Sequence, residues 1–184
     1  MQKSTKVLLI IVYSLFLVVS FGLPFFSFEG YSILSNTTSH LAAQSSPFAW
    51  VMDLIFICLG VASILINYKT GVVYHQVFGC IFGFSLIMTA FFPHAPLVTN
   101  VLPNLFFDKM HSIFASITGF SFTMLAFGHG IVSREKQRFW GFVMATIAIL
   151  VSMGMMMFPS FMGILQRIMF MSAFGWLFFY MRTP

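Results

Sequence analysis

The chain has 184 residues, of which 59% are hydrophobic and 7% are charged, and its formal net charge is +5. Ordinary soluble domains carry about 25% charged residues. Nine basic and four acidic side chains are too few to hydrate the surface of a soluble domain of this length. The composition therefore excludes a soluble enzyme, a disordered chain and a nucleic-acid-binding module, and it predicts a multi-span membrane protein.

Six continuous apolar runs follow one another along the chain. They are residues 7–26, 48–67, 72–93, 112–132, 139–158 and 164–181. Each is close to the ~20 residues that cross a bilayer core as a helix, and none alternates as a barrel strand would. The sequence therefore predicts an all-α fold, a six-transmembrane-helix bundle that forms a single integral membrane domain over residues 1–184.

Basic residues are distributed unequally between the two ends of the predicted helices. One side carries Lys109 and Arg167, and the other carries Lys3, Lys6, Lys69, Arg134, Lys136, Arg138 and Arg182. Because Lys and Arg accumulate on the cytoplasmic side, both termini are expected in the cytoplasm. The expected location is the plasma membrane.

The two long connections, residues 27–47 and 94–111, both lie on the predicted outer side. Extra loop length on one face indicates that this face carries the function. Ser35 or Asn36 is expected to cap a short helix that continues through Gln44. In the third run, Gly79 and Gly83 form a G-x-x-x-G pattern, which predicts close approach to a neighbouring helix.

Several short motifs in and beside these outer connections resemble those of a known family. They are Ser35-Asn36-Thr37-Thr38-Ser39-His40-Leu41 with Ser46-Pro47, Phe92-Pro93-His94, His111, and Gly163-Ile164-Leu165-Gln166-Arg167. The chain is similar to a prokaryotic family of membrane proteins designated domain of unknown function 998. The resemblance implies a fold and a membrane location but no activity. His40 stands where the family usually has an acidic residue, which puts any role of that carboxylate in doubt.

Most of the side chains that could titrate, bind a ligand or coordinate a metal lie on or just beneath the predicted outer surface. We expect a ligand pocket formed by Glu29, Asn36, Ser39, His40, Asp53, His94, Asp108, His111, Gln166 and Arg167. Asp53 and Arg167 lie at matching depths within the second and sixth runs. Since an isolated charge at that depth is costly, their matched positions predict an ion pair.

Two functions are consistent with this outer cluster. The first is binding or sensing of a lipid headgroup, a small ligand or a membrane partner. The alternative is a metal-dependent hydrolase that acts on a lipid at the outer leaflet, in which His40, Asp53, His94 and His111 bind zinc or a similar divalent ion and Asp108 is the base. The bilayer is the expected partner in both cases, no nucleic acid is expected, and the sequence indicates no oligomeric state.

Overall fold

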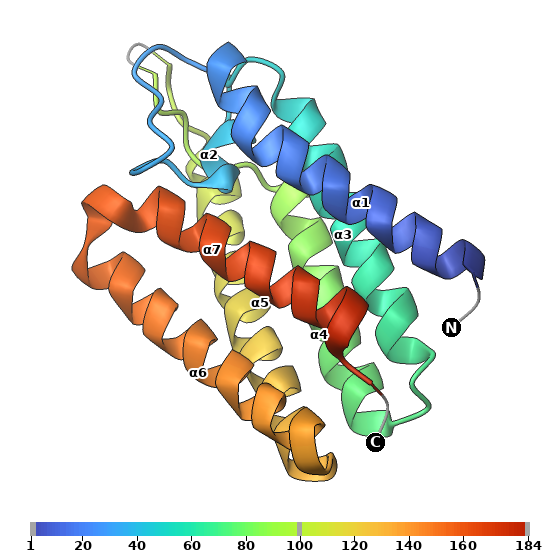
Figure 1. Cartoon of the computed structure of the whole chain (residues 1–184). Coiled ribbons are helices and arrows are strands. Elements are labelled where there is room, and N and C mark those ends of the chain that lie inside the picture. The colour runs from blue at the N-terminus through green and yellow to red at the C-terminus, as the bar shows by residue number, and fades with distance from the viewer. Residues whose placement is uncertain (1–2, 99–100, 183–184) are drawn as a thin grey trace.

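The computed structural model describes residues 3–98 and 101–182, which form helices and connecting loops without a strand. Six long helices dominate (Figure 1): α1 (Lys3–Gly22), α3 (Ala49–Tyr68), α4 (Val73–Phe91), α5 (Leu105–Val132), α6 (Glu135–Met157) and α7 (Met162–Gly175). The shorter elements are η1 (Leu23–Phe26), α2 (Thr38–Leu41), η2 (Pro159–Phe161) and η3 (Trp176–Tyr180). Six helical segments are long and apolar enough to cross a membrane, which confirms the predicted fold class.

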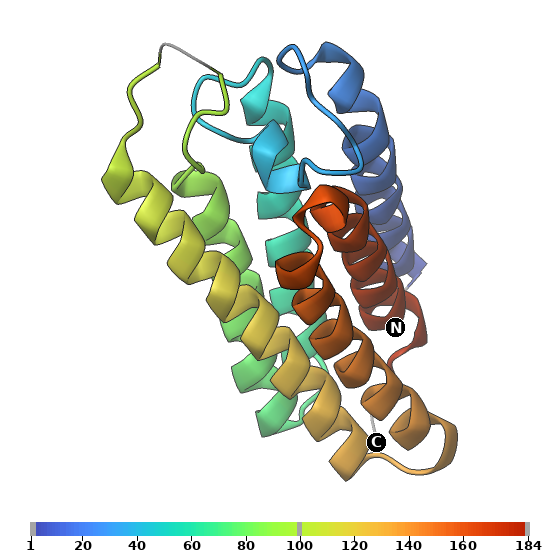
Figure 2. The same cartoon turned by 90° about the vertical axis from the view of Figure 1, so that its left-hand side faces the viewer.

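The helices pack mainly against their sequence neighbours. Helices α3 to α7 each contact the next one along the chain, and α1 packs against α3 and α7. Both described chain ends lie at one end of the bundle, here called the terminal end. The connecting segments 27–48, 92–98 and 101–104 lie at the opposite end, here called the loop end (Figure 2).

The boundaries of two helices differ from the apolar runs. Helix α5 begins at Leu105 rather than at residue 112, because the Asn104 side chain accepts a hydrogen bond from Phe107 N at 3.2 Å and caps the helix. Asp108 in the first turn also interacts favourably with the positive end of the helix dipole. The last run divides into α7 and the π-helical turn η3, which Met181 N closes by donating to Trp176 O at 2.8 Å.

Helices α3 and α4 approach closely through two glycines. A Cβ atom on Gly83 would overlap the Gly60 carbonyl oxygen, and a Cβ atom on Gly60 would overlap that of Gly83. Gly79, one turn away, packs in the same way against Asn67. The approach predicted from the G-x-x-x-G pattern is therefore confirmed, since these glycines allow backbone contact between the two helices.

Candidate functional site

Arg167 is the most buried cation at the loop end, with no exposed surface. Its guanidinium donates to Ser20 O (3.1 Å), Ile33 O (3.2 Å), Asn36 O (2.7 Å), Gly163 O (3.0 Å) and the Tyr31 hydroxyl oxygen (2.6 Å). These acceptors come from α1, from the 27–48 loop and from α7 itself. Arg167 therefore links the 27–48 loop to α1 and α7 through hydrogen bonds. Gly163 has no side chain, which allows the loop backbone to lie directly on α7.

The predicted ion pair between Asp53 and Arg167 is wrong. Within the described part of the chain, the one contact shorter than 4.0 Å between a basic and an acidic side chain joins His94 Nε2 and Asp108 Oδ1 at 3.8 Å, and it is an ion pair only when the imidazole is protonated. The charge of Arg167 is accommodated by carbonyl dipoles instead of a carboxylate. Asp53 Oδ1 is buried and has no hydrogen-bond partner among residues 3–98 and 101–182.

Tyr31 links the Arg167 guanidinium to the loop backbone. Its hydroxyl donates toward Thr37 O at 2.8 Å and Asn36 O at 3.1 Å while it accepts from Arg167. Burial raises the pKa of the Tyr31 phenol, whereas the charge and the hydrogen bond of Arg167 act in the opposite direction. No sequence pattern distinguished Tyr31, because its role depends on a contact with a residue 136 positions away.

The short helix α2 begins with a capping box in which a histidine takes the acidic position. Thr37 is the N-cap residue, and His40 Nδ1 accepts from Thr37 N at 3.3 Å. His40 Nδ1 also lies 3.1 Å from Asn36 Nδ2. The expected cap at Ser35 or Asn36 and the expected extension through Gln44 are therefore wrong, since α2 ends at Leu41. His40 replaces the Glu or Gln that usually completes such a box.

His40, His94, His111 and Asp108 form one polar group at the loop end, here called the histidine cluster. The ring centroids of His40 and His94 are 4.9 Å apart, and those of His94 and His111 are 5.7 Å apart. His111 Nδ1 lies 2.8 Å from Phe92 O and 3.2 Å from Thr89 O. Asp108 Oδ1 accepts from Ala95 N at 2.7 Å. The structure thus brings together four of the residues singled out in the sequence.

The bonding of the three rings limits what the histidine cluster can bind. His94 Nδ1 and His111 Nδ1 face carbonyl oxygens, so both nitrogens carry a proton, and Nε2 of His94 lies toward Asp108 Oδ1 at 3.8 Å. His40 Nδ1 accepts from donors, so its Nε2 carries the proton. Burial lowers the pKa of His40 to about 4, and repulsion from the Arg167 guanidinium and from the His94 and His111 rings in their protonated form acts in the same direction. Among the described residues, no three His, Cys, Asp or Glu side chains are arranged to hold a metal ion.

Gln44 joins the two loop-end connections. Its backbone N donates to His94 O at 2.9 Å, and its side chain exchanges hydrogen bonds with Asn104 N (2.8 Å) and Asn104 O (3.1 Å). Its amide also donates to Pro93 O at 3.2 Å. Gln44 therefore positions the segment that carries His94, a role the sequence did not indicate.

A cavity of about 500 Å³ lies below this polar layer, within the bundle. Its walls come from α4, α5, α6 and α7, with Phe56 of α3 and Ser39 of α2. Phe120, Ile149, Met153 and Met156 line it and are also exposed on the outer surface of the bundle, so the cavity opens between α5 and α6. These two helices diverge toward the loop end (Figures 1 and 2).

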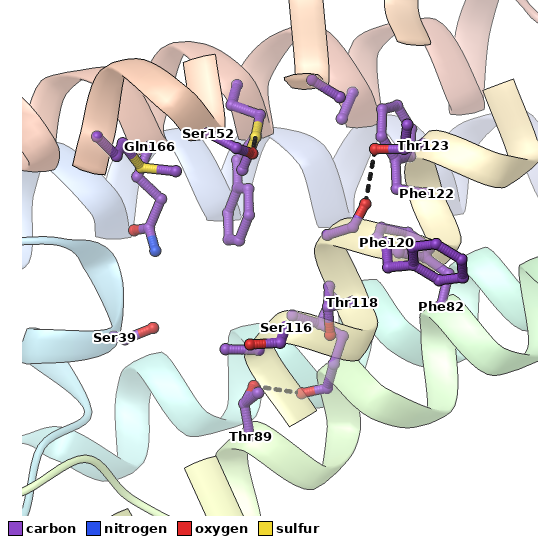
Figure 3. Close-up of a pocket in the computed structure, with 18 of the residues that line it drawn as sticks. Ser39, Phe82, Thr89, Ser116, Thr118, Phe120, Phe122, Thr123, Ser152 and Gln166 are labelled. Atoms are coloured by element: carbon purple, nitrogen blue, oxygen red, sulfur yellow. Dashed lines mark hydrogen bonds between the residues drawn. The ribbon is translucent and has the colours of Figure 1, made fainter. Parts of the chain in front are cut away.

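The lining of this cavity is mainly apolar, with several Ser and Thr hydroxyls, and two polar side chains lie at its loop-end side. Ser39 and Gln166 lie there, opposite Phe120 and Thr123 (Figure 3). Gln166 Oε1 accepts from Thr38 N at 2.8 Å and Thr38 Oγ1 at 2.7 Å, which fixes the amide and leaves the Nε2 donor for a ligand. Of the predicted pocket residues, these two reach the cavity, whereas Glu29 is exposed and belongs to neither the cavity nor the histidine cluster.

Together, the fold and the site define a multi-pass helical membrane protein whose loop end combines a buried polar layer with an intramembrane cavity. The model of a family described as protein of unknown function (DUF998) matches residues 7–183. The chain belongs to this family, which confirms the resemblance found in the sequence. No curated protein and no solved structure matches the chain.

Proposed function

We propose that this protein binds a membrane lipid at the outer leaflet, with the acyl chain in the cavity between α5 and α6 and the headgroup beneath the 27–48 loop. The observation that carries the proposal is the cavity of about 500 Å³, which opens between α5 and α6 on an apolar outer surface and has polar donors at one side. This volume is within the range of about 300–1,000 Å³ that is typical of ligand pockets. An occupant must be apolar along most of its length and polar at one end.

The polar end of the ligand is expected to accept hydrogen bonds. Gln166 Nε2 and the Ser39 hydroxyl are the donors at the loop-end side of the cavity. The hydroxyls of Thr89 and Thr123 already donate to backbone carbonyls of their own helices. An ester carbonyl or a phosphate oxygen matches Gln166 and Ser39, and both occur at the headgroup level of a phospholipid.

Gly119 of α5 offers a direct test. It lines the cavity, and a Cβ atom on it would meet nothing within 4 Å. Gly119→Leu should therefore place its side chain in the cavity, since the first atom added to Gly119 meets no neighbour. Gly22→Leu is the matched control, because it adds the same side chain at a helical glycine with open space outside the cavity.

The probe is a phosphatidylcholine that carries a photoreactive diazirine in its acyl chain, incorporated in vesicles with the protein. Illumination should label peptides from 115–123 and 148–156 in the unaltered protein and in the Gly22→Leu variant. Labelling of these peptides should fall several-fold in Gly119→Leu. Equal labelling of all three proteins would contradict the proposal.

A zinc-dependent lipid hydrolase is the second candidate, because three imidazoles and Asp108 converge at the loop end. His40, Asp53, His94 and His111 would be its ligands and Asp108 its base. The acceptor role of His40 Nδ1 and the separate environment of Asp53 count against it. Elemental analysis decides: stoichiometric zinc that is lost in His94→Ala would favour the hydrolase, and zinc-free protein after growth with added zinc would exclude it.

A further inference from the structure

Three hydroxyl side chains line the loop-end cavity with their protons already used. They are Thr89 of α4 and Ser116 and Thr123 of α5. Each donates to a backbone carbonyl three or four residues earlier in its own helix, at 2.6, 2.8 and 2.9 Å respectively. A hydroxyl oxygen whose proton is used keeps lone pairs that can accept a hydrogen bond. Toward the cavity, these three side chains are therefore acceptors.

Two further hydroxyls in the lining have a different role. Thr118 donates to Ser85 Oγ at 2.9 Å, so it belongs to a contact between α4 and α5. Ser152, on the α6 wall, faces the sulfur of Met169 at 3.9 Å. Because a thioether is a weak acceptor, the Ser152 hydroxyl can turn toward a ligand as donor or as acceptor.

Thr89 and Ser116 lie near the polar side of the cavity. Helix α4 ends at the loop end, two residues after Thr89. Helix α5 starts at the loop end, so Ser116 lies about 10 Å nearer to that end, along the helix axis, than Thr123. Figure 3 shows Ser116 between Ser39 and Thr123. A lipid whose polar end reaches Gln166 and Ser39 therefore places the start of its acyl chain at the level of Thr89 and Ser116.

The bond that joins an acyl chain to its lipid backbone decides whether these acceptors are used. An ester has oxygen acceptors and no donor, so beside Thr89 and Ser116 it would place acceptors against acceptors. An amide has the same carbonyl oxygen and also an N–H donor. Burying an N–H group in an apolar site is costly unless an acceptor is present. The hydroxyl oxygens of Thr89 and Ser116 are acceptors of this kind.

We propose, building on the lipid binding proposed above, that the loop-end cavity selects a lipid with an amide-linked acyl chain. The amide N–H donates to the hydroxyl oxygen of Thr89 or Ser116. The carbonyl or headgroup oxygens accept from Gln166 Nε2 and the Ser39 hydroxyl, and the acyl chain lies along Gly119 between α5 and α6. The donor on the lipid backbone, and not the charge of the headgroup, then determines the selection.

Two photoreactive probes that differ in one atom group test this selection. One is a phosphatidylcholine with a diazirine in an ester-linked acyl chain, and in the other an amide replaces that ester. Each is added at the same mole fraction to phosphatidylcholine vesicles that contain the protein. Labelling of residues 115–123 and 148–156 is divided by labelling of residues 7–18 of α1, which includes several exposed apolar side chains outside the cavity. This ratio should be roughly three- to ten-fold higher for the amide probe, as expected for one net hydrogen bond.

Two variants and one control identify the source of the preference. Thr89→Val combined with Ser116→Ala removes both acceptor oxygens and should make the ratios of the two probes about equal. Ser112→Ala is the matched control, because the Ser112 hydroxyl also donates to a carbonyl one turn earlier in α5, at 3.1 Å, but lies outside the cavity lining. It should leave the preference for the amide probe unchanged.

The outcomes separate this inference from the lipid binding on which it rests. Equal ratios for the two probes in the unaltered protein, or a preference that persists in Thr89→Val with Ser116→Ala, would overturn the selection of an amide. In both cases, cavity labelling that Gly119→Leu still blocks would leave the lipid site itself supported. Absence of cavity labelling by both probes would overturn both proposals.

Discussion

Arg167 shows how a buried charge can hold a membrane protein together without an opposite charge. It donates to the carbonyl oxygens of Ser20, Ile33, Asn36 and Gly163, whose dipoles take the place of a carboxylate. The sequence indicated that this residue is important, because a cation at that depth is rare. The sequence did not indicate the hydrogen-bond partners of Arg167, because every residue has a backbone carbonyl and the sequence does not show which of them accept.

Arg167→Gln should lower the free energy of unfolding by roughly 3 kcal/mol, because several buried acceptors lose a charged donor. Chemical unfolding in mixed micelles measures the change. Lys109→Gln is the control, since it removes the same charge from an exposed side chain at the same end of the bundle. Combining Arg167→Gln with Asp53→Asn should give additive losses, because the two residues form no ion pair. A combined loss well below the sum would restore the pairing that the structure contradicts.

His40 should make the stability of the protein depend on pH. Its pKa is lowered from 6.5 to about 4, mainly by burial and then by the positive charges around it. Between these values the unfolded chain binds the proton more readily than the folded one. The contribution of neutral His40 is therefore complete above about pH 6.5 and is lost progressively as the pH falls toward 4.

His40→Gln keeps an acceptor at the third position of the capping box but cannot bind a proton. Its melting temperature should fall less between pH 7.5 and pH 4.5 than that of the unaltered protein. The rest of the chain is identical in the two proteins, so the difference between their pH profiles reports His40 together with its electrostatic coupling to the neighbouring rings. If the melting temperatures of the two proteins fell in parallel with pH, His40 Nδ1 would not act as the acceptor in the capping box.

Most helices could be predicted from the sequence, and the exceptions have local causes. Apolar runs mark the length of chain inside the bilayer, so they missed the first two turns of α5, where Asp108 and Lys109 interrupt the apolar pattern. Likewise, periodicity could not reveal the π-helical turn of η3, because one shifted hydrogen bond leaves the composition unchanged. The Gly79–Gly83 pattern succeeded because close backbone contact requires the absence of a side chain.

The contact between α3 and α4 should be sensitive to a single methyl group. Gly83→Ala places Cβ against the Gly60 carbonyl, which is backbone and cannot rotate away, and should cost about 1–3 kcal/mol. Gly119→Ala, which meets open space, should instead stabilise by up to about 1 kcal/mol through better helix propensity. Thermal unfolding of the two variants in one detergent gives the comparison. Equal changes in stability for Gly83→Ala and Gly119→Ala would mean that helix propensity, and not the contact with Gly60, determines the effect.

The orientation of the whole molecule in the membrane is a prediction that rests on the distribution of its basic residues. Seven basic residues occur at the terminal end or its connections, against Lys109 and Arg167 at the loop end. Arg167 is buried and bound by carbonyls, so it exposes no charge to either aqueous side. The exposed basic residues are therefore still more unequally divided than the sequence alone indicates, and the terminal end is expected in the cytoplasm.

Cysteine labelling in intact cells tests this orientation without altering any charge. In a background with Cys58 and Cys80 replaced by Ser, Leu102→Cys places a thiol on a loop-end residue that is 94% exposed, and Ser4→Cys places one at the exposed start of α1. A membrane-impermeant maleimide should label Leu102→Cys in intact cells, and it should label Ser4→Cys only after the membrane is opened. With the terminal end in the cytoplasm, the 27–48 loop, which covers the polar side of the cavity, is expected to face outward. Labelling of Ser4→Cys but not Leu102→Cys in intact cells would invert the molecule and place the proposed lipid site in the opposite leaflet.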